Sequence, residues 1–198
     1  MMWIDDPLVT IRPLTPDRYH ELHELEKAAD HEGLWRFGGT MPDFDTYLPT
    51  LWANVTGQCA LSRSDGHLLG TVMVYDTDLR SGTAWVAAMV ADDAQGWGVG
   101  LLGLGHVITE LFRNWRLRRV CAEVLEPNLT QFSSHLDRFA TEYGRLRGDQ
   151  LVGDELVDVV ILGIDRDTWR REAEPRLLRR RSGGTSARIA EIPIEGVP

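Results

Sequence analysis

Three glycines alternate with other residues between a short apolar run and a segment of helical periodicity. The run ends at Val90, the glycines are Gly96, Gly98 and Gly100, and apolar side chains at helical spacing follow from Leu101. Glycines between a strand and a helix let backbone N–H groups converge on an anion, which the positive end of the helix dipole also attracts. The stretch therefore predicts a phosphate-binding loop.

Two phosphate-bearing ligands fit such a loop. Residues 98–103 satisfy the G-x-G-x-x-G pattern of dinucleotide-binding proteins, and Glu123 follows about twenty residues later, where an acidic residue binds the ribose. In that motif, however, the first glycine comes almost directly after a strand of a repeated parallel β-α-β unit. Here seven residues separate Val90 from Gly98, and hairpin-linked strands precede them. This context disfavours a nicotinamide cofactor.

Counted from Gln95, the same loop has the order Gln-x-x-Gly-x-Gly, with glycines at positions 98 and 100. This order resembles the pyrophosphate loop of the GCN5-related N-acetyltransferase (GNAT) superfamily. Asn128, in the run Glu-Pro-Asn between a strand and a helix, is similar to a second position of that family. The resemblance covers residues 8–165, and its closing hairpin is closest in style to bacterial enzymes that acetylate ribosomal-protein N-termini.

The elements expected around the loop agree with that fold. Their order is β-α-α-β-β-β-α-β-α-β-β, which predicts a mixed α/β (α+β) domain with a twisted, mostly antiparallel sheet flanked by helices. The resemblance implies that the fourth and fifth strands splay apart. We expect residues 1–168 to form this domain and residues 169–198 an Arg-rich helix and a flexible tail. Strands are expected at residues 8–13, 58–63, 67–76, 83–90, 118–125, 145–151 and 155–164, and helices at 15–29, 45–54, 98–112, 129–141 and 165–181.

The resemblance further implies acetyl-CoA as the co-substrate, with no metal. Its pantetheine arm would lie between the splayed strands, bonded by backbone groups, while N–H groups of the glycine loop hold the pyrophosphate and Asn128 faces the pantetheine or the sulfur. The residues assigned to the coenzyme are Met89, Val90, Gln95, Gly96, Trp97, Gly98, Val99, Gly100 and Asn128.

Acyl transfer to an amine needs a neutral nucleophile, support for the oxyanion and a proton for the departing thiolate. Many members of the superfamily place an acidic residue on the fourth strand, but the corresponding run here, TAWVAAMV, has no titratable residue. Glu123, on the adjacent strand, is the best local replacement. Four loop residues are alternatives, each also explicable as an ordinary surface or capping residue: His31, Glu32, Asp76 and Asp78.

The tyrosine that many members use as the acid has no counterpart in this chain. Ser133, Ser134 and His135 occupy that turn, in the run SSHLDRF, and Tyr143 lies too far along the sequence to assume the role. We assign Ser134 and His135 to the catalytic group. This departure from the family pattern leaves three options: an acceptor amine of lower pKa, a base on a loop beside the acceptor, or catalysis by proximity alone.

Trp35, Arg36 and Phe37 lie in the loop between the first two helices, which borders the acceptor in the superfamily and which we call the acceptor loop. They are either binding residues or a hydrophobic lid. The net charge of −9 favours a cationic acceptor, such as a polyamine or an aminoglycoside, over nucleic acid. The closing hairpin instead suggests a peptide N-terminus, so both kinds of amine remain open.

The remaining expectations concern location, partners and other functions. The chain opens without a secretory signal and has no apolar run long enough to cross a bilayer, so we expect a cytoplasmic protein without a membrane partner. His20 and His23 lack further residues to complete a metal site. A homodimer is an option through residues 156–164. Two alternatives keep the fold: a transferase that takes its acyl group from aminoacyl-tRNA, with Arg179–Arg181 on the RNA, and a non-catalytic acyl-CoA-binding module.

Overall fold

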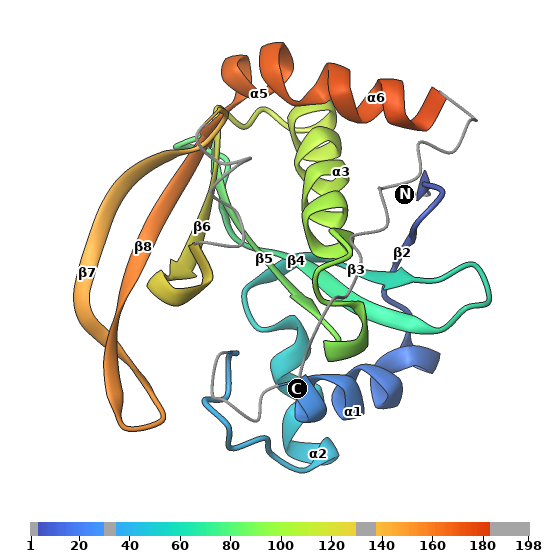
Figure 1. Ribbon diagram of the computed structural model, residues 1–198, viewed down its shortest axis with the longest axis vertical. Coiled ribbons are helices and arrows are strands. Elements are labelled where there is room, and N and C mark those ends of the chain that lie inside the picture. Colours follow the sequence, from blue (N-terminus) through green and yellow to red (C-terminus); the bar gives the residue numbers. More distant parts are fainter. Residues whose placement is uncertain (1–3, 30–34, 130–137, 183–198) are drawn as a thin grey trace, which may run out of the picture.

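One mixed sheet organises the protein. The computed structural model describes residues 4–29, 35–129 and 138–182. Within these ranges eight strands form a sheet in the order β1-β2-β3-β4-β5-β6-β8-β7, in which β5 and β6 are parallel and all other neighbours antiparallel (Figure 1). This confirms the predicted mixed α/β fold. The strands are β1 (Ile4–Asp5), β2 (Thr10–Pro13), β3 (Val55–Ser62), β4 (Leu68–Asp78), β5 (Thr83–Val90), β6 (Arg119–Leu125), β7 (Thr141–Val152) and β8 (Glu155–Asp165), and the helices are α1 (Tyr19–Ala29), α2 (Phe44–Tyr47), α3 (Val99–Asn114), α5 (Arg166–Glu172) and α6 (Glu174–Ser182).

Helices cover both faces of the sheet, and each face has its own core. Since successive side chains of a strand point to opposite faces, Leu61 packs with the residues of α3 whereas its neighbour Ala60 packs with those of α1 and α2. In Figure 1, α3 lies above strands β3 to β5, and α1 and α2 lie below them. In the described part of the chain, no helix is both long and apolar enough to cross a membrane.

Gly103 lets α3 lie close against the sheet. A Cβ at this position would stand 2.7 Å from Cδ2 of Leu61, which is fully buried. Gly105, two residues on, faces Leu177 of α6 instead, at 3.0 Å from an ideal Cβ, and Leu177 is only partly buried. The two helical glycines therefore have different surroundings although they lie on the same helix.

The matched variants Gly103→Ala and Gly105→Ala are expected to differ in stability. Each gains about 1 kcal/mol of helix propensity. Gly103→Ala must also displace a fully buried side chain, and such overpacking costs about 1 to 3 kcal/mol. We expect its free energy of unfolding to lie about 1 to 2 kcal/mol below that of Gly105→Ala in urea titrations. Equal stability of the two variants would show that the Leu61 contact does not constrain α3.

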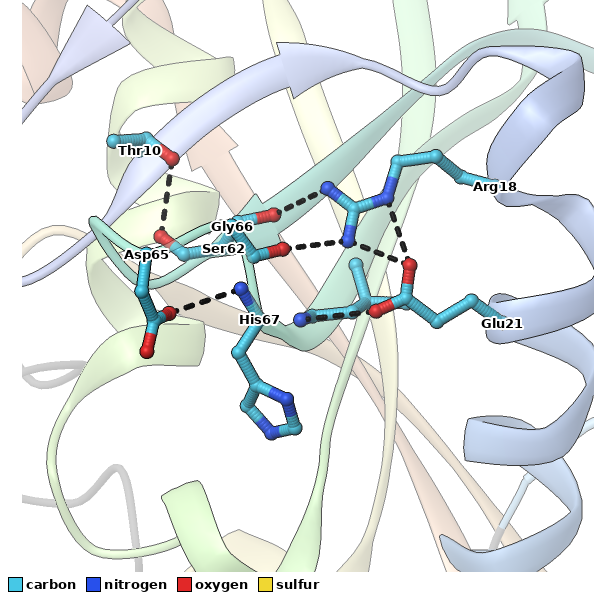
Figure 2. Close-up of polar contacts among 8 residues, drawn as sticks. Thr10, Arg18, Glu21, Ser62, Asp65, Gly66 and His67 are labelled. Carbon is cyan, nitrogen blue, oxygen red and sulfur yellow. Dashed lines mark hydrogen bonds and ion pairs between the residues drawn. The ribbon is translucent and has the colours of Figure 1, made fainter.

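Arg18 and Glu21 fix the start of α1 against the turn between β3 and β4 (Figure 2). The Arg18 guanidinium donates to the Ser62 hydroxyl at 3.0 Å and to the Gly66 carbonyl at 2.9 Å, and it also binds one carboxylate oxygen of Glu21. The other oxygen of Glu21 accepts the Leu68 N–H at 3.2 Å. These bonds set the position of α1, which carries Glu26 toward the acceptor loop.

Several element boundaries differ from the sequence prediction. The helix expected at 45–54 is divided into α2 and a 3-10 turn at Leu48–Trp52, because Pro49 has no N–H for a continuous α-helix. The helix expected from residue 15 begins with a 3-10 turn at Pro16–Arg18. Thr141, expected to end a helix, begins β7 instead. The two-residue strand β1 is too short for any periodicity to reveal it.

The C-terminal helices pack on the core of the α3 face. Trp169 of α5 is 3% exposed, and its indole N–H donates to the Thr109 hydroxyl of α3 at 3.0 Å. The domain boundary expected between residues 168 and 169 falls inside α5. The expected terminal helix is interrupted at Ala173, which separates α5 from α6, and the two helices follow one another along the top of Figure 1.

Candidate active site

The glycine loop connects the end of β5 to the first turn of α3. Gly96 and Gly98 have φ values of 77° and 75°, a left-handed conformation that favours glycine. Ala94 and Val99 on either side are buried, which anchors the loop at both ends. The Gln95 side-chain amide donates to Asp92 at 2.9 Å and holds the 3-10 turn that leads into the loop.

The start of α3 has the features of an anion site. Gly98 occupies the N-cap position and makes no side-chain cap, so the first N–H groups of the helix are available to an external acceptor. The space beside Gly96 and Gly98 is open, because an ideal Cβ at either would meet no atom within 4 Å. At Gly100, by contrast, a Cβ would stand 2.7 Å from Val90, so the first turn of α3 packs against the end of β5. A phosphate-bearing ligand fits this arrangement.

The strands β5 and β6 separate just before the loop. They are paired only between residues 83–85 and residues 119–121, and beyond these pairs each strand continues without the other. The predicted splay of the two central strands is thereby confirmed. Successive side chains of each separated segment point to opposite faces of the sheet, so different side chains line the gap on the two faces.

Two cavities lie on opposite faces of this gap. On the α3 face, Val86, Ala122 and Val124 line a small apolar cavity of about 60 Å³. On the face of α1 and α2, their neighbours Ala87 and Glu123 line a larger cavity of about 480 Å³. We name this larger space the acceptor cavity. Its other lining residues include Trp35, Arg36, Phe37, Asn54, Tyr75, Asp76, Leu125, Gln150 and Val159.

An ion pair fixes the acceptor loop at the cavity wall. The Glu26 carboxylate is fully buried on α1 and accepts from both Nε and Nη2 of Arg36, at distances from 2.9 to 3.1 Å. Burial raises the pKa of Glu26 above its ordinary value, and the Arg36 guanidinium opposes this rise. Since the charge of Arg36 is matched by Glu26, Asp76 and Glu123 give the cavity a net negative character.

Tyr75 lies near the two acidic residues of the cavity. Burial, together with the charges of Glu123 and Asp76, raises the pKa of Tyr75 to about 12. The phenol therefore keeps its proton at neutral pH and can donate a hydrogen bond. Among the described residues, neither Asp76 nor Glu123 has a hydrogen bond or an ion pair through its carboxylate. Both carboxylates are exposed and available to a cation.

The backbone is strained at the rim of this cavity. Asn54 and Asp76 have φ values of 57° and 43°, and in the described residues they are the two non-glycine positions with positive φ. The Asp76 N–H donates to the Asn54 carbonyl at 3.0 Å, where the pairing of β4 with β5 is irregular. Such conformations cost of order 1–3 kcal/mol each and cluster at functional sites. They fix where the Asp76 side chain leaves the strand.

The structure brings some of the predicted site residues together. Trp35, Arg36, Phe37 and Glu123 line one cavity, with Asp76 beside them. Asp78 does not line it: its carboxylate accepts the N–H groups of residues 80 and 81 and caps a turn.

Some of the other predicted residues lie in the described ranges, and four lie outside them. Gln95 to Gly100 form the loop, Trp97 is 66% exposed within it, and Met89 is buried with the residues of α1. Asn128 lies half-buried in a 3-10 turn after β6. Four predicted residues lie outside the described ranges: His31, Glu32, Ser134 and His135.

Sequence reasoning missed Tyr75 and Asn54. Tyr75 continues an apolar strand pattern, so nothing local marks it as a cavity residue.

The two histidines considered for a metal site have other partners. His20 stacks on Phe44, and a ring nitrogen of His23 contacts the Pro42 carbonyl. Across the described ranges, no group of three or more His, Cys, Asp or Glu residues could hold a metal ion.

Comparison with known families identifies the family of this chain. Residues 9–133 match the family described as Acetyltransferase (GNAT) domain. Because the match spans more than half of the chain, the protein belongs to the GNAT acetyltransferase family. The resemblance predicted from the loop is thereby confirmed. No curated protein sequence shows significant similarity to this chain.

Solved structures share the fold at low sequence identity. A spermidine N-acetyltransferase from Vibrio cholerae, in complex with CoA and spermine, is 16% identical with a TM-score of 0.72, covering 82% of this chain and 98% of that one. A ribosomal-protein-alanine N-acetyltransferase from Brucella melitensis is 17% identical with a TM-score of 0.66, covering 78% of this chain and 98% of that one. At these identities the comparisons establish the fold, and the acceptor must be argued from the site itself.

Proposed function

We propose that the protein is an acyl-CoA-dependent N-acyltransferase, which moves an acetyl group from acetyl-CoA to an amine by direct attack in a ternary complex. The observation that carries this proposal is the position of the open glycine loop. It lies at the end of β5, where β5 and β6 separate into a gap that has Glu123 on the side of the acceptor cavity.

In this proposal the donor is bound along the loop and the gap. Backbone N–H groups of residues 96–100 bind the pyrophosphate at the positive end of α3. The pantetheine arm lies between the splayed strands, against the backbone of Met89 and Val90, and Asn128 stands near the arm or its sulfur. Gln95 holds the turn that leads into the loop, Val99 anchors the loop in the core, and Trp97 lies exposed within the loop.

Glu123 is the general base of the proposed reaction. Glu123 takes one proton from the ammonium, and the neutral nitrogen then forms a bond to the acyl carbon while the carbon–sulfur bond breaks. The second proton, which the nitrogen loses on becoming an amide, passes through water to the departing thiolate. An alkyl ammonium of pKa about 10.4 is neutral in about one molecule in 2,500 at pH 7, a deficit of about 4.6 kcal/mol. For an α-amino group the deficit is about 1 kcal/mol. The base therefore matters most for an alkyl amine.

The acceptor we favour is a cationic alkyl amine. Asp76 and Glu123 are the unpaired charges of the cavity, while the aromatic rings of the acceptor loop offer surface for an alkyl chain or for cation–π contact. The spermidine acetyltransferase that shares this fold supports a polyamine. A peptide N-terminus is the second candidate, because Gln150 and Val159 of the β7–β8 hairpin also line the cavity and the Brucella relative is named for such an acceptor.

Ligand-dependent stability and thiol release test the proposal. Acetyl-CoA at about 1 mM, with a Kd near 10 µM, adds about 2.7 kcal/mol of stability and raises Tm by several degrees. NAD and ATP serve as controls and are expected to give no comparable shift. Release of free CoA thiol is then measured with a polyamine, an aminoglycoside and a peptide with N-terminal alanine. Acetylation of any of these amines supports an N-acetyltransferase.

Other outcomes separate the alternatives. A shift with acetyl-CoA but no turnover on any amine indicates a non-catalytic acyl-CoA-binding module. No shift with acetyl-CoA, together with RNase-sensitive transfer from aminoacyl-tRNA, indicates the tRNA-dependent transferase. Either result overturns the proposed function.

A further inference from the structure

A groove runs from the glycine loop along α3 to helix α6. Its volume is about 500 Å³, and Gly96, Trp97 and Gly98 are among the residues that line it. Apolar residues form its floor, among them Leu101 of α3 and Trp169 of α5. Two arginines of α6, Arg176 and Arg180, also line it. We call this space the α6 groove.

Helix α6 is firmly attached to α3. Leu177 packs on Gly105, and Glu174 at the start of α6 forms an ion pair with Arg113 at 2.6 Å. Ala173, between α5 and α6, is buried in the core of the α3 face. The arginines of α6 therefore stand at a defined place along the groove.

Arg180 is engaged by a buried carboxylate. The Asp6 side chain is fully buried, with Oδ2 at 3.4 Å from Nε of Arg180 and at 3.7 Å from Nε2 of His106. Burial tends to raise the pKa of Asp6, but His106, the Leu8 N–H and Arg180 together hold it below its ordinary value. Asp6 is therefore charged at neutral pH and balances Arg180.

Arg176 has no such partner. Its side chain is exposed on the groove, and within the described residues it takes part in no hydrogen bond or ion pair. Arg179, on the same helix, is also exposed but does not line the groove. A free guanidinium that lines the same apolar groove as the glycine loop suits a ligand that has two separate anionic groups and an apolar ring.

We propose that Arg176 recognises the phosphate on the ribose of coenzyme A, with the adenine on the apolar floor and the pyrophosphate at the glycine loop. This inference rests on the proposed function. Guanidinium groups bind phosphate through paired charge-assisted hydrogen bonds, which a neutral hydroxyl cannot match. Arg180, held by Asp6, is a positioning residue that keeps α6 in place beside the groove. Helix α6 thus becomes part of the donor site, although it lies outside the matched family region at residues 9–133.

Binding of CoA and of dephospho-CoA, which lacks only the ribose phosphate, tests this proposal. Calorimetry on the full chain is expected to give the wild type about a tenfold preference for CoA. Arg176→Ala is expected to bind CoA as weakly as dephospho-CoA, with its affinity for dephospho-CoA unchanged. Arg176→Lys restores part of the preference, because it keeps the charge but not the paired geometry. Arg179→Ala is the matched control and retains the full preference.

Kinetics separate recognition from a general loss of structure. Arg176→Ala is expected to raise KM for acetyl-CoA about tenfold while kcat stays within about twofold. Equal binding of both ligands by the wild type, or a preference that survives Arg176→Ala, overturns the inference while CoA binding still supports the proposed function. Arg176→Ala that loses tRNA binding but keeps the CoA preference overturns it in favour of an RNA contact. A wild type that binds neither ligand overturns both proposals.

Discussion

Gly98→Glu is expected to weaken acetyl-CoA binding by about a hundredfold or more. Glycine 98 has φ 75° at the N-cap of α3, and the space beside it is open, so the new side chain fits sterically but projects where the pyrophosphate is proposed to lie. Its carboxylate would compete for the helix N–H groups and repel the phosphates. Calorimetry with acetyl-CoA measures the effect directly.

Gly66→Glu is the matched control for this variant. Gly66 has φ 92° in the turn between β3 and β4, with equally open space, so the substitution brings the same charge and a similar backbone strain at a remote site. A left-handed conformation costs a non-glycine residue about 1–2 kcal/mol. Both variants are thus expected to lose similar stability, but only Gly98→Glu to lose the coenzyme. Retention of normal acetyl-CoA affinity by Gly98→Glu would contradict the proposed cradle.

Glu123→Gln is expected to lower kcat by about 10² to 10³-fold for an alkyl amine at pH 7, which is within the usual contribution of a general base. For a peptide α-amino group the loss is expected to be about tenfold, because that amine is already partly neutral. The loss on the alkyl amine should shrink as the pH approaches the pKa of its ammonium. Steady-state rates over pH 7 to 10 with both acceptors measure this difference.

Asp76→Asn makes the same carboxylate-to-amide change in the same cavity. Because Asp76 lies at the rim and is proposed to attract the cation rather than to take its proton, the variant is expected to raise KM for the amine with little change in kcat. An unchanged kcat in Glu123→Gln would remove Glu123 from the mechanism. Equal kcat losses in both variants would indicate that the cavity needs negative charge rather than a specific base.

Local sequence signals predicted the loop and most elements well. The glycines at 96, 98 and 100 mark the loop because left-handed backbone and close approach are local requirements. Apolar, β-rich runs located β3 to β6 and β8, and helical spacing located α3. The predicted boundaries of elements were wrong where a proline or a tertiary contact determined where the element ends, as in the division of the helix at Pro49.

The acceptor cavity was harder to predict because its partners come from distant parts of the chain. Arg36 and Glu26 are ten residues apart in different elements, so no helical or strand spacing links them. Glu123 is proposed as the base by elimination, since β5 has no titratable residue, but its place beside Tyr75 depends on how far β5 and β6 stay paired.

The separation of β5 and β6 also bears on the order in which the two substrates bind. The gap opens to a small cavity under α3 on one face of the sheet and to the acceptor cavity on the other. With the donor entering from the loop side and the amine from the opposite face, neither molecule crosses the route of the other. Under the proposed function, neither has to bind first, and a random-order kinetic mechanism follows from the architecture of the sheet.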